Sequence, residues 1–136
     1  MMNLRRAACF LCAVLTGAVM AGCVGAPSND VTITFRYSRF APEALTVQAG
    51  VPVTFTLRNE DPIEHEWIVG PSEVHERHRL GTEPVHDELP TEVTVPPLST
   101  RTTTLTFDQP AEYPIICHLP GHEAYGMRGT LRVVAR

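Results

Sequence analysis

Short runs in which apolar and polar residues alternate, separated by proline and glycine, restrict this 136-residue chain to a fold built of β-strands. Residues 51–57 carry an apolar side chain at every second position, and the Thr-rich residues 103–107 alternate in a similar way. A period of two is that of a strand with one buried face, and β-branched residues favour strands. Several short strands with this punctuation predict an all-β sandwich. Further β-like runs cover residues 31–37, 45–48, 65–69 and 130–135.

One segment departs from this pattern, because residues 72–80 can form two turns of helix. Ser72 is placed to cap its N-terminus, and Gly81 is placed to end it. The segment opens a charged insertion at residues 71–92 that has little strand character. A connection of this length in a compact domain is uncommon and is often functional or mobile.

The N-terminal segment resembles an export signal rather than part of a folded domain. Arg5 and Arg6 precede an apolar run at residues 7–20, as the charged and apolar regions of such a signal do. The run has 14 residues, whereas a membrane-spanning helix needs about 20. We therefore expect residues 1–22 to be a signal peptide that is removed on export.

The run is followed by small residues and Cys23, an ending that resembles a bacterial lipobox, in which the cysteine is lipidated and becomes the new N-terminus. Lipidation would hold the protein on the extracytoplasmic face of a bacterial membrane, in the periplasm or at the cell surface. Residues 23–30 would then form a flexible tether, and residues 31–136 a single domain. The alternative is an ordinary secretory signal that happens to contain Cys23.

Close to the C-terminus, residues 117–127 bring three metal-binding residue types into one short segment. They contain Cys117, His122 and Met127, and a further histidine, His65, begins an upstream β-like run. One thiolate, two imidazoles and a weak thioether are the donors that hold copper in electron-transfer sites. Cys117 is also the single cysteine of the expected mature domain, so metal binding would explain a thiol without a disulfide partner. The alternatives are an inert buried thiol, a hydrogen-bonded histidine and a methionine that fills the core.

The segment from Tyr113 to Val134 resembles the C-terminal part of the cupredoxin (blue-copper) family, which includes plastocyanins and azurins. It contains Tyr-Pro-Ile-Ile-Cys, then Pro-Gly-His, then Gly-Met-Arg-Gly-Thr-Leu-Arg-Val. The resemblance extends over residues 31–136 and implies a Greek-key β-sandwich with one copper ion per chain. Carried over position by position, it implies four copper ligands: His65, Cys117, His122 and Met127.

Alternation along the strand before Cys117 distinguishes between the two nearby histidines. Tyr113, Ile115 and Cys117 share one face of this strand, and His118 lies on the other. If the first face points into the sandwich, Cys117 points inward and His118 points away from it. His122 lies beyond a Pro-Gly turn, where the chain can fold back, so His122 rather than His118 is the expected ligand.

The sequence departs from plastocyanin-like proteins at two positions beside the ligands. There, an asparagine commonly follows the first histidine ligand and bonds to a Ser or Thr after the cysteine, whereas this chain has Glu66 and His118. We hypothesise that Glu66 and His118 form a hydrogen-bonded pair that holds the two ligand segments together. The reduction potential would then change with pH as His118 titrates near neutrality. The alternative is that both side chains face solvent.

Charge limits the choice of partner. The formal net charge is −4, and ten of the 15 acidic residues lie between Glu60 and Glu92, so nucleic acid is not an expected partner. Such a run is usually a solvated surface. It could also form an acidic docking face for a redox protein with a basic surface.

Three histidines in the charged insertion, His75, His78 and His86, form a second candidate metal cluster. His75 and His78 are three residues apart and would share a helix face. Zinc or copper could bind there. Loose surface histidines are the alternative.

Together these features predict a monomeric electron carrier that cycles Cu(I)/Cu(II) between membrane-associated redox partners and is not an enzyme. The alternative is a protein that stores, delivers or confers resistance to copper, for which a labile site with several Met or His ligands would be expected. Met127 is the single methionine of the expected mature chain, which favours electron transfer. An oxidase or nitrite reductase would need more copper sites than one small domain supplies.

Overall fold

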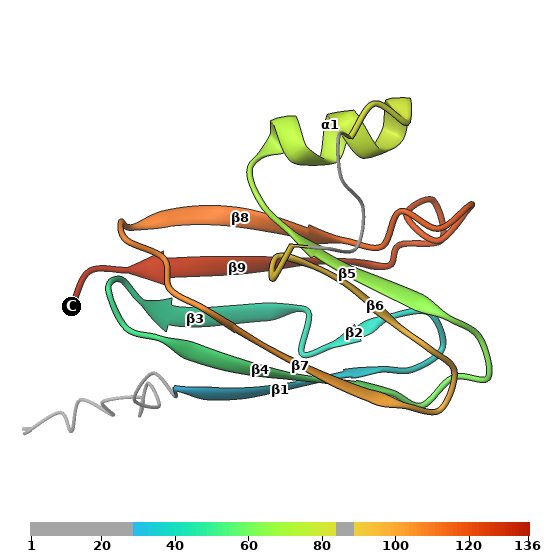
Figure 1. Ribbon diagram of the computed structural model, residues 1–136, viewed down its shortest axis with the longest axis horizontal. Helices are drawn as coiled ribbons and strands as arrows, with labels where there is room; N and C mark the ends of the chain where they lie inside the picture. The colour runs from blue at the N-terminus through green and yellow to red at the C-terminus, as the bar shows by residue number, and fades with distance from the viewer. Residues whose placement is uncertain (1–28, 84–88) are drawn as a thin grey trace, which may run out of the picture.

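The computed structural model describes residues 29–83 and 89–136, and these residues form nine strands and one helix. Two sheets pack face to face with the helix on the outside of one of them (Figure 1). In chain order the elements are β1 (Asp30–Phe35), β2 (Phe40–Ala41), β3 (Ala44–Gln48), β4 (Val53–Asn59), β5 (His65–Val69), α1 (Ser72–Leu80), β6 (Glu92–Val95), β7 (Thr100–Leu105), β8 (Ala111–Ile116) and β9 (Arg128–Val134).

The strand order is β2-β1-β4-β7 in one sheet and β3-β9-β8-β5-β6 in the other. Most neighbours are antiparallel, but β1 pairs with β4 and β3 pairs with β9 in parallel. The predicted all-β sandwich with a short helix in the charged insertion is therefore confirmed.

The core lies between the two sheets and is built from the alternating positions that the sequence indicates. On β4, Val53, Phe55 and Leu57 are all buried, while the residues between them are less so. Trp67 on β5 is fully buried and its ring lies 5.0 Å from that of Phe55. Apolar burial of this kind is the main favourable contribution to folding.

Strand β5 differs from the others because every one of its five residues is buried. Its outer side is not open to solvent, and on this side of the sheet α1 contacts the neighbouring strand β8 (Figure 1). The helix has the expected bounds and ends at Gly81 with φ 62°, where the Gly81 N–H meets the carbonyls of Arg77 and His78. The expected N-cap was wrong by one residue: Pro71 occupies that position, with no capping side chain, and Ser72 is the first helical residue.

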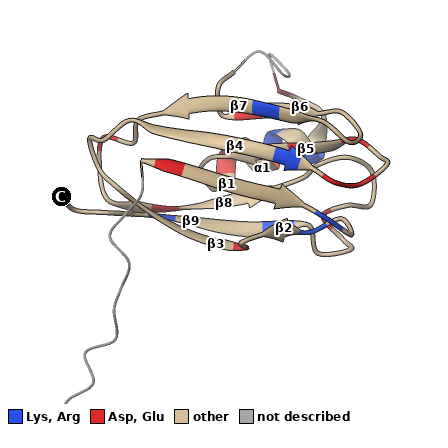
Figure 2. Ribbon diagram, turned by 90° about the horizontal axis from the view of Figure 1, so that it is seen from below, with Lys and Arg blue, Asp and Glu red and all other residues tan. Residues whose placement is uncertain are grey.

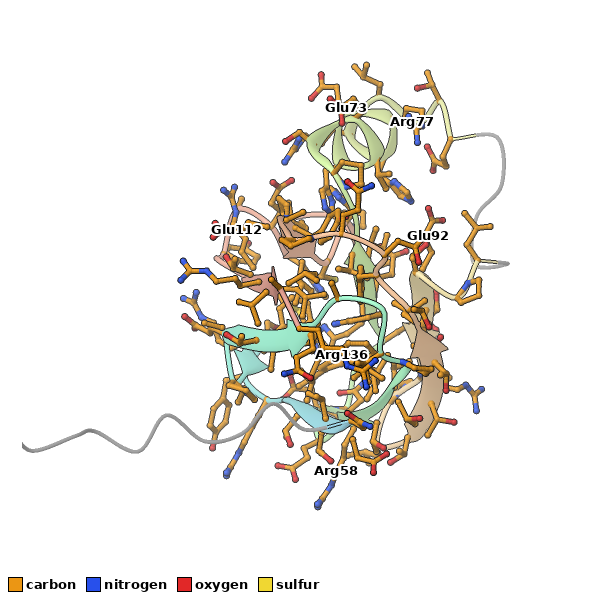
Figure 3. All side chains as sticks on the ribbon, turned by 90° about the vertical axis from the view of Figure 1, so that its left-hand side faces the viewer. Arg58, Glu73, Arg77, Glu92, Glu112 and Arg136 are labelled. Atoms are coloured by element: carbon orange, nitrogen blue, oxygen red, sulfur yellow. The ribbon has the colours of Figure 1, made fainter. Side chains whose placement is uncertain are left out.

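The covered face of β5 shows how the helix is attached. Val74 packs against Gly70, where an added Cβ would lie 3.1 Å from a Val74 methyl carbon. Glu73 and Arg77, in contrast, lie on the outer side of α1, away from the sheets (Figure 3). The helix therefore has one polar, exposed side and one buried side. The buried side carries His75, which is 1% exposed.

Three predicted features fall on residues outside the described ranges. The signal peptide at 1–22 and Cys23 precede residue 29, and His86 lies in the stretch 84–88. Within the described ranges, no helix has the length and apolar character needed to cross a membrane.

Candidate metal centre

Three side chains from separate parts of the chain converge at one end of the sandwich. Nδ1 of His65 lies 3.2 Å from Nδ1 of His122, and Sγ of Cys117 lies 3.2 Å from the same His122 atom. All three ligand atoms lie within 4.8 Å of one another. Among the described residues, these are the His, Cys, Asp and Glu side chains grouped closely enough to hold a metal ion.

Strands β5 and β8 position His65 and Cys117. His65 is the first residue of β5, where it pairs with Val95, and Cys117 directly follows β8. The Cys117 N–H donates to the carbonyl of Met127 at 3.2 Å, which closes the loop that joins β8 to β9. Both His65 and Cys117 are fully buried, as the alternation along β8 predicts for Cys117.

His122 reaches the centre from a tight turn inside the 117–127 loop. Its N–H donates to the carbonyl of Leu119 at 3.0 Å, and Gly121, with φ 85°, supplies a left-handed conformation that favours glycine. Burial, followed by the nearby His65, lowers the pKa of His122, although Asp61 opposes this shift. The ring is therefore neutral at pH 7 and its Nδ1 can donate a lone pair to a metal.

Asp61 orients the other histidine, and the sequence analysis missed this residue. Its Oδ2 lies 2.9 Å from Nε2 of His65. Because an ionised carboxylate can only accept a hydrogen bond, the His65 proton is on Nε2 and the lone pair is on Nδ1, facing the centre. The signal in the sequence was an acid four residues before the histidine, but such spacing alone is common in loops.

The carboxylate of Asp61 is held as an anion. Burial works to raise its pKa, but hydrogen bonds from the main-chain N–H groups of Ser38 and Tyr37 and from His65 outweigh burial and leave the pKa below its ordinary value. The two main-chain bonds are both 2.8 Å long, with Tyr37 N–H on Oδ1 and Ser38 N–H on Oδ2.

The Cys117 thiol is buried beside this pair and is difficult to ionise without a cation. Burial raises its pKa to about 11, although the main-chain N–H groups of Glu66 and Leu119 act in the other direction. The Glu66 N–H donates to Sγ at 3.3 Å. A bound metal ion would remove the proton, since a coordinating thiol is deprotonated outright.

Met127 is fully buried at the other end of the same loop. Its N–H donates to the carbonyl of His122 at 3.0 Å, so its main chain is bound to the turn that carries a candidate ligand. Its role as a fourth, axial ligand stays a prediction.

The expected Glu66–His118 pair takes a different form. Glu66 Oε2 accepts a hydrogen bond of 3.1 Å from the main-chain N–H of His118, not from its ring, so the two ligand segments are joined through the main chain. Burial lowers the pKa of His118 to about 4, and the nearby His75 adds to this effect. The expectation that the His118 ring titrates near neutrality is therefore corrected, because its ring is buried beneath α1.

The His118 ring lies in a cluster of imidazoles under the helix. Its Nε2 lies 2.9 Å from Nδ1 of His75, and the His78 ring stacks on it at 5.1 Å. Nε2 of His75 lies 3.2 Å from the carbonyl of Pro114, which can only accept. His75 therefore donates to Pro114 and accepts from His118, so both nitrogens of His75 are used within the protein. The predicted metal cluster of His75, His78 and His86 stays untested, because His86 lies outside the described residues.

The helix also binds the ligand loop by an ion pair. The guanidinium of Arg79 contacts both carboxylate oxygens of Glu123, with the shortest distance 2.7 Å. The hydrogen bonds from Arg79 lower the pKa of Glu123 and outweigh burial, which acts to raise it. Since Glu123 follows His122 directly, α1 is joined to the loop next to a candidate ligand.

Charged residues are spread over both sheets rather than gathered on one face (Figure 2). Within the acidic run, Asp61, Glu66 and Glu92 are buried and cannot belong to a docking surface. Glu60 and Glu76 pair with Arg58 and Arg79. The number of acids along the sequence therefore overstates the acidity of any one surface.

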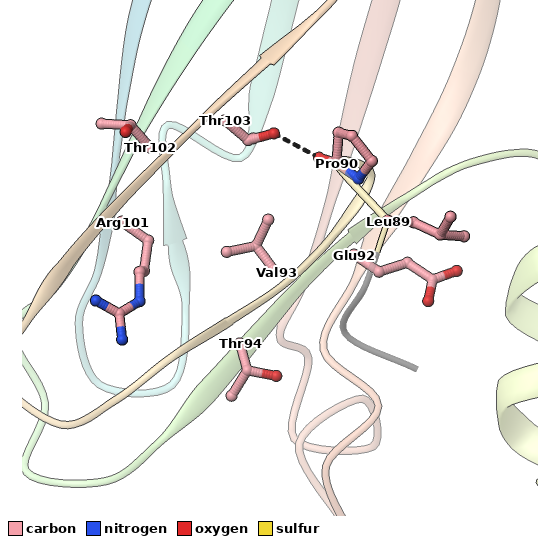
Figure 4. Close-up of a pocket in the computed structure, with 8 residues that line it drawn as sticks. All are labelled: Leu89, Pro90, Glu92, Val93, Thr94, Arg101, Thr102 and Thr103. Carbon is pink, nitrogen blue, oxygen red and sulfur yellow. Dashed lines mark hydrogen bonds between the residues drawn. The ribbon is translucent and has the colours of Figure 1, made fainter. Parts of the chain in front are cut away.

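A cavity of about 390 Å³ lies between β6 and β7, apart from the metal-binding residues (Figure 4). The Thr103 hydroxyl donates to the carbonyl of Pro90 across it at 2.7 Å. It is wide open, and none of His65, Cys117 and His122 lines it.

Comparison with known proteins agrees with this architecture. A family model described as "Cupredoxin-like domain" matches residues 7–133. No curated protein sequence matches the chain.

Three solved structures illustrate the likeness. The sodium-dithionite-reduced auracyanin of Roseiflexus castenholzii is 21% identical, with 80% of this chain and 99% of that chain covered and a TM-score of 0.67. Auracyanin B is 22% identical over 81% of this chain and 91% of that chain, with a TM-score of 0.65. Auracyanin A, described as a "blue" copper protein from Chloroflexus aurantiacus, is 25% identical over 80% of this chain and 100% of that chain, with a TM-score of 0.64.

Proposed function

The chain belongs to the cupredoxin-like domain family, and from that premise we propose that it is a copper-binding electron-transfer protein. His65, Cys117 and His122 would hold one copper ion, and Met127 would supply a weak axial thioether. The observation that carries the proposal is the convergence of two imidazole nitrogens and one thiol sulfur within 4.8 Å.

The donor set fits copper rather than a hard cation. A soft thiolate with imidazoles is typical of copper and zinc sites, whereas Mg²⁺ and Ca²⁺ prefer oxygen. Copper supplies a one-electron change between Cu(I) and Cu(II). The likeness to auracyanin A, described as a blue copper protein, supports copper over zinc.

The protein's own contribution is to hold these donors in place. Asp61 orients His65, the Glu66 N–H contacts the sulfur of Cys117, and the main-chain bonds of the 117–127 loop hold His122. A site whose ligands are fixed by their surroundings changes little between oxidation states. Fast electron exchange needs such a site.

His122 is the natural route for electrons, because it is partly exposed while His65 and Cys117 are fully buried. Tyr37 and Leu98 have exposed apolar side chains, and both lie on loops next to the candidate centre. Their main-chain N–H groups donate hydrogen bonds to Asp61. A redox protein could dock there, and any basic surface on it would be attracted by the net negative charge. The proposed role is accordingly that of an electron carrier.

Lipidation at Cys23 would hold this carrier at the extracytoplasmic face of a bacterial membrane. The proposal is supported by the small residues before Cys23 and the apolar run preceding them. Replacing Cys23 by Ser should move the protein from the membrane fraction to the soluble fraction, as measured by fractionation of the producing cells. A Cys23→Ser protein that stays in the membrane would exclude this anchor.

The visible spectrum tests the proposed copper centre directly. Cu(II) added to the purified domain should give an intense thiolate-to-copper band in the red, and Cys117→Ser should abolish it, since the band requires the sulfur. His118→Asn is the matched control: it changes a neighbouring residue that is not a proposed ligand and should keep the colour. A pale wild-type protein, or a coloured Cys117→Ser variant, would contradict the proposal. Rapid loss of copper to a chelator would favour copper delivery.

A further inference from the structure

We propose that Asp61 sets the reduction potential of the centre, by placing a fixed negative charge on the outer nitrogen of His65. The inference rests on the proposed copper site. It concerns a residue that is not itself a ligand, and it makes Asp61 a positioning residue that favours the oxidised state of the metal.

The first step is the contact itself. Asp61 Oδ2 lies 2.9 Å from His65 Nε2, and both side chains are screened from solvent, at 7% and 0% residue exposure. The opposite ring nitrogen, Nδ1, faces Cys117 and His122. Carboxylate, imidazole and metal position thus lie in sequence, an arrangement that fixes the tautomer and makes the imidazole a stronger donor.

The second step is that Asp61 cannot turn away. Its side chain accepts main-chain N–H groups from Tyr37 and Ser38. Its own N–H donates to Asn59 Oδ1 at 3.0 Å, and its carbonyl accepts the N–H of Leu98 at 3.1 Å. The residue is therefore held on both its side chain and its main chain before any metal binds.

These partners also explain the unusual backbone nearby. Tyr37, Ser38 and Leu98 have φ values of 55°, 51° and 52°, which non-glycine residues rarely adopt. Such conformations persist where the surrounding structure holds them. Asp61 is a group that binds all three of these residues as well as His65.

The third step is electrostatic. Reduction of Cu(II) to Cu(I) adds one electron and removes one positive charge from the centre. A nearby anion stabilises the more positive, oxidised state more than the reduced state, and this difference is large where solvent is excluded. The Asp61 carboxylate therefore lowers the potential relative to an uncharged residue of the same shape.

The test compares Asp61→Asn with wild type in the copper-loaded protein by voltammetry. The variant should weaken Cu(II) binding about tenfold more than Cu(I) binding, within the range seen for such partners. This corresponds to a rise in potential of about 59 mV for a one-electron couple. Glu60→Gln is the matched control, since it removes a neighbouring charge that pairs with Arg58 and not with His65. An unchanged or lower potential in a folded Asp61→Asn protein overturns the inference, as does an equal rise in Glu60→Gln.

A second measurement needs neither copper nor the variant. In the metal-free wild-type chain, ¹⁵N NMR should find the His65 proton on Nε2, with slow exchange because Asp61 accepts it. A proton on Nδ1 alone, or rapid exchange at Nε2, overturns the inference even if Asp61→Asn fails to fold. A wild-type protein that binds no copper would instead defeat the proposed function, and a coloured protein with an unshifted Asp61→Asn potential would defeat this inference alone.

Discussion

At the scale of single residues, the candidate centre brings one thiol sulfur and two imidazole nitrogens within 4.8 Å of one another. The Cys117 thiol has a pKa of about 11 because it is buried, so it is protonated at pH 7 in the metal-free chain. The two histidine Nδ1 atoms lie 3.2 Å apart, so in the metal-free chain a proton on Nδ1 of His122 can be donated to the lone pair on Nδ1 of His65. A metal ion replaces this arrangement with three favourable bonds, which is why its binding should also stabilise the fold.

Met127 provides a prediction at this scale. Met127→Leu keeps a buried apolar side chain of similar volume, so we expect the free energy of unfolding of the metal-free protein to change by less than about 1.5 kcal/mol. The copper colour should remain, because the strong donors are unaltered, but the reduction potential should change because the proposed axial thioether is lost. Denaturant unfolding and voltammetry measure the two effects. An unaltered potential would show that Met127 is only a core residue.

At the scale of elements, α1 distinguishes this protein from a sandwich built of two sheets alone. It packs against β8 and brings His75 against His118. Through Arg79 and Glu123 it also binds the ligand loop. Because the Arg79–Glu123 ion pair is partly exposed, it contributes little to stability by itself. The contact between the buried His75 ring and the His118 ring therefore holds the helix more strongly.

The burial of His75 predicts how stability depends on pH. Burial, ahead of the hydrogen bond to Pro114 that opposes it, lowers the pKa of His75 below its ordinary value of 6.5. The unfolded chain therefore binds more protons once the pH drops below about 6.5, and the folded state loses stability as pH falls towards the lowered pKa. The nearby Arg79 and His78 act in the same direction on the pKa of His75.

His75→Gln tests this dependence in the metal-free protein. The wild type should lose stability as the pH falls below 6.5, and the variant should lose less, since one buried titrating group is gone. Fluorescence of Trp67, the single tryptophan and fully buried, reports unfolding in denaturant at each pH. Parallel curves for the two proteins would contradict this explanation.

At the scale of the whole molecule, the exposed apolar loops and the partly exposed His122 lie at the same end. Leu98 is 72% exposed and is joined through Asp61 to His65. Solvent-exposed apolar side chains near a redox centre suit brief encounters between electron-transfer proteins. Electron exchange should therefore depend on the loops beside His122 rather than on the outer faces of the sheets.

Leu98→Asp tests this role. When two copies of the protein exchange electrons, like charges would meet at the docking surface, so the self-exchange rate at low salt should fall about tenfold or more. Aspartate tolerates the positive φ of this position, so the fold should be kept. Leu80→Asp on α1 is the control, because Leu80 is similarly exposed but lies on the helix. Equal slowing in both variants, measured by NMR line broadening, would contradict docking at the loop end.

Much of the architecture followed from local patterns. Alternation every second residue identified β4, residues 65–69 were recognised as a β-like run without it, and the helix at 72–80 has the bounds expected from its charged segment and Gly81. Three of the four predicted ligands, His65, Cys117 and His122, lie together. These features are local because backbone conformation depends on near neighbours, and because a single thiol among histidines restricts the chemistry before any fold is known.

Side-chain pairing across the fold could not be obtained this way. Asp61 meets the main chain of Tyr37 from 24 residues away, and His75 meets His118 from 43 residues away. Glu66 binds the His118 N–H because α1 draws the His118 ring to the other side. Such pairs depend on how strands and helix pack against one another, and packing is a property of the whole chain. Composition and spacing therefore identified the donor residues. Only the tertiary structure determined which ring nitrogen of His65 points to the other donors and that the Asp61 carboxylate contacts the opposite nitrogen.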